Sequence, residues 1–124
     1  MANECTPLFR PGRDVTVLAT ANVVGKTFVG VSGNRDTASG LIKAVTATAA
    51  AKAFGVAAYD AANGKTCPVI RAGIVPVTAG GTIAAGAEVE VGASGRAVTL
   101  ASGKAVGYAV DGGTSGNDVL IALY

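Results

Sequence analysis

The stretch Ala53-Phe54-Gly55-Val56-Ala57-Ala58-Tyr59-Asp60, followed by Asn63-Gly64 and then by Val69-Ile70-Arg71-Ala72-Gly73, predicts a β-hairpin. Asn-Gly between two apolar runs is the strongest short hairpin signal, because both residues tolerate the positive φ of a type I′ turn. In a strand, side chains alternate between the two faces of the sheet. The first run therefore places Phe54, Val56 and Ala58 on one face and Gly55, Ala57 and Tyr59 on the other.

The same pattern returns near the C-terminus. Residues 105–110 (AVGYAV) lead into a glycine-rich turn, and residues 119–123 (VLIAL) follow it. When Gly55 is aligned with Gly107, Phe54 and Val56 match Val106 and Tyr108. Residues 28–31 (FVGV) are a weaker third copy. The chain is therefore expected to contain two similar hairpins.

Composition favours an all-β fold. The chain has 124 residues, of which 50% are hydrophobic, but with 3 Phe, 3 Tyr and no Trp its core must consist mainly of small side chains. Its 18 glycines, scattered between short apolar runs, indicate many turns. This length suits one domain that closes a core without a metal or a disulfide.

Alternation and turn residues predict further short strands along the chain. They are expected at residues 15–20, 27–32, 42–47, 69–72, 74–78, 87–91, 96–100 and 105–110 and at the C-terminal end. A turn or one short helical turn should follow the strand at 42–47. Pro68 and Pro76 lack a backbone donor, which restricts them to a strand start, an edge or a bulge. The predicted fold is a small closed or nearly closed β-barrel or sandwich of short antiparallel strands.

Residues 1–13 are predicted to be an extended N-terminal arm in front of a single β domain, residues 14–124. Pro7 and Pro11 oppose both helix and central strand. Leu8 and Phe9 are apolar in a segment with little to pack on locally. Two interpretations remain open: the arm folds back on its own barrel, or it reaches a neighbouring subunit.

Charge patterning argues against a nucleic-acid or membrane protein. The net charge is +2, and the charges are dispersed singly rather than gathered in a basic stripe. Arg10 and Arg13 come closest to a cluster and are better interpreted as part of a solvated arm than as a phosphate clamp. No signal peptide and no run long enough to span a membrane is present, so a soluble protein is expected.

No catalytic or cofactor motif is found. Gly-Lys-Thr occurs at residues 25–27 and 64–66, but neither copy has the preceding glycine of a phosphate-binding loop. The chain has no His, so an imidazole base and a histidine-based triad are excluded. Glu88 and Glu90 are expected to be solubilising charges on one exposed strand face. Two cysteines without His cannot build a zinc site, and a calcium site at Asp111, Asn117 and Asp118 has little to recommend it.

The stretches that resemble a known family are residues 54–60 and 70–80, the opening residues 3–12 (NECTPLFRPG) and the ending residues 121–124 (IALY). They are similar to the capsid cement, or head decoration, proteins of tailed bacteriophages. The resemblance implies a non-enzymatic protein on the exterior of the virion capsid, assembled in the host cytoplasm. Its partners would be the major capsid protein and copies of itself, in a homotrimer.

The same resemblance, taken with the arm, indicates which residues would meet the capsid. Leu8, Phe9, Arg10 and Arg13 are the predicted contact residues. Cys5 and Cys67 are expected to be reduced thiols, because such proteins assemble in a reducing compartment. The alternative is a small ligand- or carbohydrate-binding β module on a virion surface. That alternative needs an aromatic-lined cleft, whereas most of the aromatic residues are expected to face inward.

Overall fold

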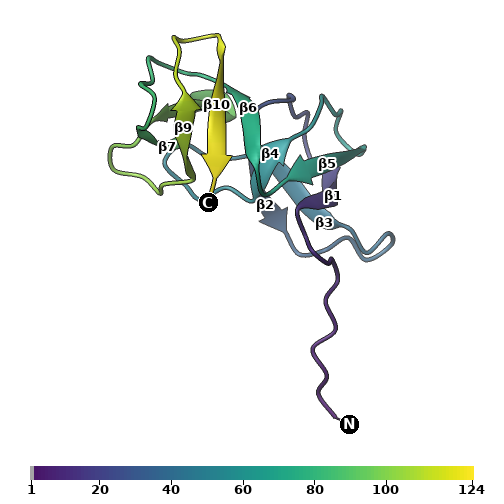
Figure 1. The fold of residues 1–124 in the computed structure, drawn as a ribbon. Helices are drawn as coiled ribbons and strands as arrows, with labels where there is room; N and C mark the ends of the chain where they lie inside the picture. Colours follow the sequence, from purple (N-terminus) through teal and green to yellow (C-terminus); the bar gives the residue numbers. More distant parts are fainter. Residues whose placement is uncertain (1) are drawn as a thin grey trace.

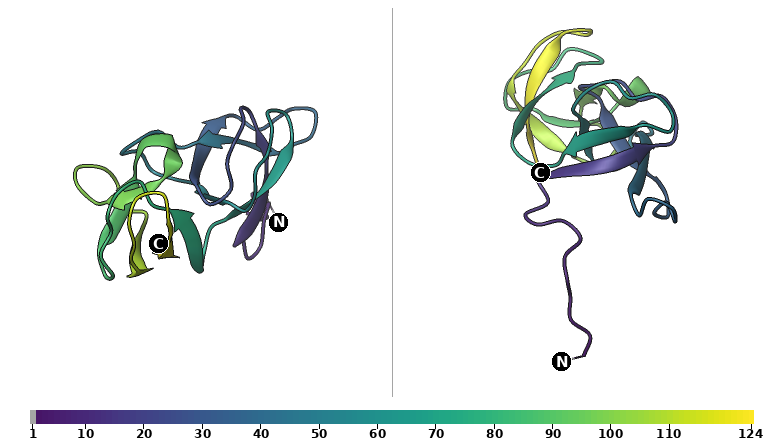
Figure 2. Two further views of the ribbon diagram at one scale, coloured as in Figure 1. Left: turned by 90° about the horizontal axis from the view of Figure 1, so that it is seen from above. Right: turned by 90° about the vertical axis from the view of Figure 1, so that its right-hand side faces the viewer.

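The computed structural model describes residues 2–124, which fold into ten β-strands in two halves that lie side by side (Figures 1 and 2). The first half comprises β1 (Asp14–Ala19), β2 (Phe28–Gly33), β3 (Ile42–Thr46), β4 (Gly55–Ala57) and β5 (Thr66–Ile70). The second comprises β6 (Ile74–Thr78), β7 (Glu88–Val91), β8 (Ala97–Thr99), β9 (Gly107–Asp111) and β10 (Asp118–Leu123), with one 3-10 turn at Ala93–Gly95. The prediction of an all-β protein is confirmed.

The first half is a closed barrel with the strand order β1-β3-β2-β4-β5. Antiparallel pairing of β1 with β5 closes it, with Val15 opposite Val69 and Val17 opposite Cys67. One pair departs from the predicted antiparallel arrangement, because β1 and β3 run parallel. The reason is topological: direction cannot alternate all the way around a closed ring of five strands, and because the other four pairs are antiparallel, β1 and β3 must run parallel.

The second half repeats this arrangement, with the sheet order β6-β10-β9-β7-β8. Its strands β6, β7, β8, β9 and β10 stand where β1, β2, β3, β4 and β5 stand in the first half. A single parallel bridge between Ala79 and Ala97 takes the place of the parallel β1–β3 pair. The second sheet therefore curls back on itself but has a weaker closing seam than the first.

The pairing registers show that the two halves are copies of one unit, which extends the predicted hairpin repeat to the whole fold. Val15 lies opposite Val69 as Val75 lies opposite Ile121. The isolated bridge of Val23 with Ala61 recurs as Ile83 with Gly113. Equivalent buried positions are Val17 and Val77, Ala19 and Ala79, Val29 and Val89, Ala57 and Ala109, and Cys67 and Val119. Because β1 and β6 have equivalent pairing registers, buried and more exposed residues alternate along both strands in the same way.

The turn at Asn63-Gly64 is not the predicted type I′ turn. Gly64 has a φ of 84°, but Asn63 is not among the residues with positive φ, whereas a type I′ turn needs positive φ at both central residues. The amide of Lys65 donates to the carbonyl of Ala62, so the left-handed Gly64 is the third residue of a type II-like turn. This turn lies within a longer loop, because β4 ends at Ala57 and β5 begins at Thr66.

The two central prolines differ in how they fit their strands. Pro76 lies in β6, an edge strand of the second sheet, as the missing donor predicts. Pro68 lies in the middle of β5, between β1 and β4, which contradicts the prediction of a strand start, an edge or a bulge. The short β4 ends at Ala57, so no strand on that side requires a donor from residue 68.

Two hydrophobic clusters hold the molecule together. One fills the first barrel with small side chains, namely Val15, Val17, Ala19, Val23, Val29, Ala44, Ala57, Ala61, Cys67 and Val69. The other joins the interior of the second half to Phe28, Val56 and Ala47, which point outward from the first barrel. The first half is therefore attached to the second by apolar side chains on its outer surface, and this burial supplies most of the driving force for docking.

Glu90 is buried, which contradicts its interpretation as a solubilising charge. Its side chain is 7% exposed, and it accepts hydrogen bonds from the amides of Ala101 and Gly103. The loop after β8 folds over the carboxylate and supplies these donors, as a buried charge requires. Glu88, two residues earlier on β7, is exposed as predicted.

Both cysteines are free thiols, with Cys5 exposed on the arm and Cys67 buried in the first barrel. Within residues 2–124, no helix is long and apolar enough to cross a membrane.

Candidate interaction surface

The N-terminal arm extends away from the body of the protein (Figures 1 and 2). Residues 2–13 form no strand, and Leu8 remains 60% exposed and Phe9 37% exposed. The amide of Arg71 donates to the carbonyl of Arg13 at 2.7 Å, which fixes the base of the arm to the end of β5. The arm is thus anchored at one end and carries apolar side chains into solvent.

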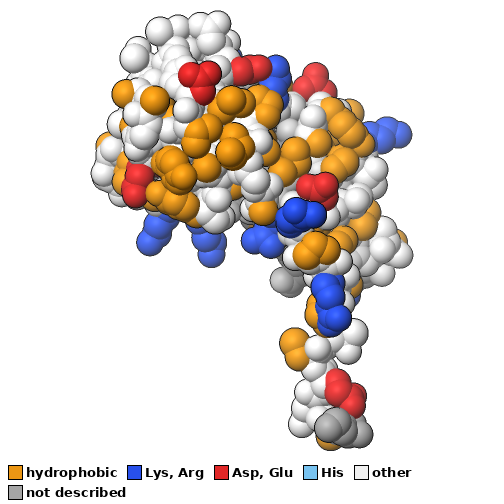
Figure 3. Space-filling view, in the orientation of Figure 1, with side chains coloured by type: hydrophobic (Ala, Val, Ile, Leu, Met, Phe, Trp, Pro, Cys, Tyr) orange, Lys and Arg blue, Asp and Glu red, His pale blue; other side chains and the backbone are white. Residues whose placement is uncertain are grey.

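Three of the four predicted contact residues lie around one shallow hollow. Phe9, Arg10 and Arg13 line it together with Asp14, whereas Leu8 lies further along the arm. Lys and Arg side chains also project along the lower edge of the body, where the arm emerges (Figure 3). An apolar arm beside a positive edge is suited to contacting a large partner surface.

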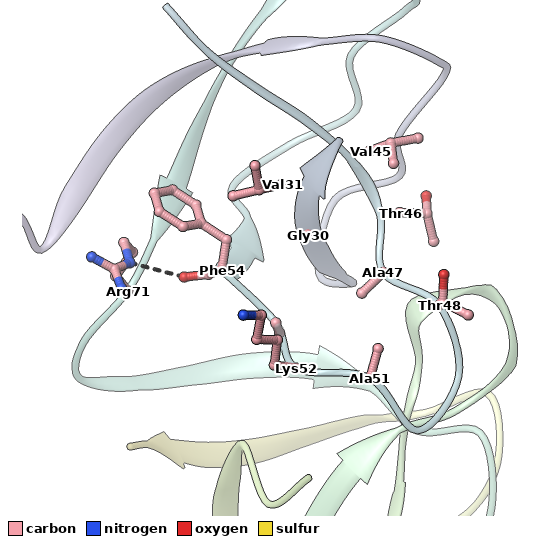
Figure 4. Close-up of a pocket in the computed structure, with 11 residues that line it drawn as sticks. Gly30, Val31, Val45, Thr46, Ala47, Thr48, Ala51, Lys52, Phe54 and Arg71 are labelled. Atoms are coloured by element: carbon pink, nitrogen blue, oxygen red, sulfur yellow. Dashed lines mark hydrogen bonds between the residues drawn. The ribbon is translucent and has the colours of Figure 1, made fainter. Parts of the chain in front are cut away.

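A groove of about 440 Å³ opens in the first half (Figure 4). Its lining residues are Gly30, Val31, Val45, Thr46, Ala47, Thr48, Ala51, Lys52, Ala53, Phe54 and Arg71. Arg71 donates from Nε to the carbonyl of Phe54 at 2.9 Å, and its guanidinium lies 4.4 Å from the centre of the Phe54 ring. One face of the aromatic ring in this groove is therefore already covered, which gives no support to the carbohydrate-binding alternative.

The structure also presents a surface that the sequence analysis missed, on the outward side of β6, β10 and β9. We call it the outer apolar face; it consists of Ile74, Pro76, Tyr108, Val110, Leu120, Ala122 and Tyr124. Orange side chains gather over these strands in Figure 3. The expectation that most aromatic residues face inward is wrong for Tyr59, Tyr108 and Tyr124, which are 53%, 41% and 65% exposed.

Tyr124 has a defined environment at one end of this face. Its hydroxyl donates to Oε1 of Glu88 at 3.0 Å, and its ring lies 6.1 Å from that of Tyr108. Desolvation and the hydrogen bond to Glu88 raise the pKa of the Tyr124 phenol above its ordinary value. The contact orders Tyr124 against the face rather than leaving it free.

In a pH titration followed by NMR, the Tyr124 phenol is expected to ionise above the pH at which free tyrosine does. In the Glu88→Gln variant this midpoint should be lower, but it should stay above that of free tyrosine, because desolvation still raises the pKa of the phenol. Because the folded-state pKa is raised, this group stabilises the fold below about pH 10 and loses that contribution as the pH rises through the folded-state value. A midpoint unaltered by Glu88→Gln would show that the hydrogen bond is not formed in solution.

Two of the three side chains considered for calcium, Asn117 and Asp118, have other partners. Asp118 pairs with Lys26 at 2.8 Å, and the amide of Asn117 donates to the Thr114 hydroxyl. Across residues 2–124, no group of three His, Cys, Asp or Glu side chains is placed to hold a metal ion.

Comparison with known proteins identifies a family and a similar solved structure. The family model described as phage cement protein matches residues 10–123. The crystal structure of the head fiber gp8.5 N base in bacteriophage phi29 superposes with a TM-score of 0.75 at 25% identity, covering 90% of this chain and 92% of that one. A search of curated proteins finds no match.

Proposed function

The chain belongs to the phage cement protein family, and on that basis we propose that it stabilises the capsid by binding across the outer surface of the shell. A capsid decoration role follows from the family, and the virion capsid is where the protein resides. The observation that carries the proposal is the extent of the family match, which includes every strand of both halves and the base of the arm.

A mechanical role accords with the architecture. Each half is a sheet of short strands curled on itself, and the two share one apolar cluster, so the body resists deformation. Because a single bridge joins β6 to β8, these end strands of the second sheet keep some unpaired backbone groups, but both strands are short, so little edge is exposed. A rigid body of this kind can transmit load between the capsid subunits that it bridges. Catalysis is no part of the proposed role.

We place the capsid contact on the arm, at Leu8, Phe9, Arg10 and Arg13. Two of these side chains offer apolar surface that the arm itself does not bury. An arm that becomes ordered on docking loses conformational entropy and regains free energy from the contacts it makes. Its anchored base, held by the bond between Arg71 and Arg13, limits how far the arm must search.

Multivalency would convert modest contacts into firm attachment. We propose that three copies associate, so that three arms engage three capsid subunits at once. After the first arm binds, the others bind at high effective concentration, and total avidity can exceed the affinity of one arm by about 10²–10⁴-fold.

The experiment that tests the proposal uses capsid shells of the cognate phage prepared without this protein. Purified protein should co-sediment with the shells up to a fixed stoichiometry and raise the temperature at which they release DNA or fall apart. Free major capsid protein that is not assembled should bind far more weakly, because it presents one site at a time. Failure to bind assembled shells would refute the proposal.

A further inference from the structure

We propose that the outer apolar face of the second half is the site where another copy of this chain docks. The inference rests on the proposed function, because it assigns a surface to the self-association that the capsid-binding trimer requires. It differs from the capsid contact, which we place on the arm.

The face is a continuous apolar surface. Strand register places Leu120 opposite Pro76, and Ala122 opposite both Ile74 and Tyr108. These side chains share one side of the sheet, because their neighbours Val119 and Ile121 are fully buried on the other. Exposed contiguous apolar patches of this kind are rare on proteins that stay monomeric, and they mark interaction sites.

Few charged groups lie on or beside the face. At one end Asp118 is paired with Lys26, and at the other Glu88 accepts the hydrogen bond from Tyr124. Between them, the outward positions of β6 and β10 carry no charged side chain, and on β9 the acid Asp111 lies opposite Leu120 at a β-bulge. A surface that consists mainly of aromatic and aliphatic residues and has few charges is typical of interfaces between copies of one protein.

The internal repeat indicates which kind of partner would cover this face. In the first half, Phe28 of β2, Val56 of β4 and Ile70 of β5 lie against the cluster of the second half. The equivalent positions in the second half hold Glu88, Tyr108 and Ala122, the last two of which belong to the outer apolar face. The surface that the first half uses to dock another unit of this fold is therefore present again on the second half, with no unit of this chain against it.

The fold that the two halves share does not require apolar residues on this face. At the equivalent outward positions, the first half has Asp14 and Thr16 where the second has Ile74 and Pro76. It has Ala58 where the second half has Val110. The two copies of the unit thus share their buried residues but differ in the residues on this outer surface.

The face is also continuous with the junction between the halves. Leu123 and Tyr124 at its lower end line a hollow together with Phe28 and Phe54 of the first half. A docked copy would therefore extend the existing interface between units. Because a closed trimer is built from heterologous contacts, the outer apolar face must meet a different surface on the next copy.

The test is the mass of the protein in solution, measured by sedimentation at several concentrations. The parent protein is expected to associate, and the double variant Val110→Lys with Leu120→Lys should be monomeric, with self-association weakened by about 100-fold or more, since two unpaired charges would be buried. Both side chains are about two-fifths exposed, so the variant should fold, which circular dichroism checks. Ala58→Lys is the matched control, placed at the position equivalent to Val110 in the first half, and it should leave the mass unchanged.

Two results would overturn the inference: a parent protein that stays monomeric, or a double variant that associates as well as the parent. If the double variant keeps its mass but loses binding to assembled shells, the face docks the shell and not another copy. Shell binding by the parent protein is measured separately. Its absence would refute the proposed function, whereas a change of mass alone bears only on the docking face.

Discussion

A variant that lacks residues 2–12 is expected to fold normally and to lose binding to assembled shells. The arm forms no strand. A hydrogen bond from the Arg71 amide to the Arg13 carbonyl holds its base to the body, and the deletion leaves both residues in place. Apolar area buried by Leu8 and Phe9 on docking would be lost from every copy of a multivalent assembly. We expect apparent affinity to fall by at least about 100-fold, measured by co-sedimentation with shells.

Point variants can distinguish the apolar and the charged parts of the arm. Leu8→Ala with Phe9→Ala removes the apolar side chains and should weaken binding at all salt concentrations. Arg10→Ala with Arg13→Ala should weaken it chiefly at low salt, where charge interactions are least screened. If the deletion variant binds shells as the full chain does, the arm is not the capsid contact and the outer surfaces of the body must be examined instead.

Phe28→Ala is expected to cause the largest loss of stability of any single substitution considered. The side chain is fully buried and belongs to the apolar cluster that joins the first half to the second. Removing a buried aromatic ring costs about 3–5 kcal/mol, because transfer free energy is lost and a cavity remains. Urea denaturation of the variant should show this decrease in the free energy of unfolding.

The internal repeat offers a matched control for that experiment. Glu88 stands at the equivalent position in β7, where it is exposed and bonded to Tyr124. Glu88→Ala should cost no more than about 1 kcal/mol, the net contribution of one exposed hydrogen bond. Equal losses for the two variants would contradict the assignment of Phe28 to the junction between the halves.

The all-β fold could be predicted because its strands carry local signals. Along β1 and β6, buried side chains alternate with more exposed ones, and glycines mark the turns. The match of Gly55 to Gly107 revealed one hairpin of what is a repeat of the whole unit. The parallel β1–β3 pair and the mid-strand Pro68 could not be predicted, because both depend on which strands become neighbours.

Of the two candidate surfaces, the arm could be predicted from the sequence and the outer apolar face could not. Prolines beside Leu8 and Phe9 predicted an apolar arm, which the structure shows extended and exposed. The outer apolar face had no distinct signal, since Tyr108 and Leu120 occur in runs that are apolar on both sides of the strand. An apolar run predicts that a strand is buried on two faces, but not whether the second face is covered by the same chain.

The sequence by itself determined the strand class, the repeated hairpin, the extended N-terminal segment and the lack of histidine chemistry, because each follows from residue type and short-range spacing. Only the tertiary structure decided which equivalent positions are buried. Phe28 and Glu88 occupy the same place in their units, yet one lies against the other half and one lies in solvent. Glu90 is buried because the loop at residues 101–103 supplies its donors. Burial depends on what lies across from a residue in space, and spacing along the chain does not specify it.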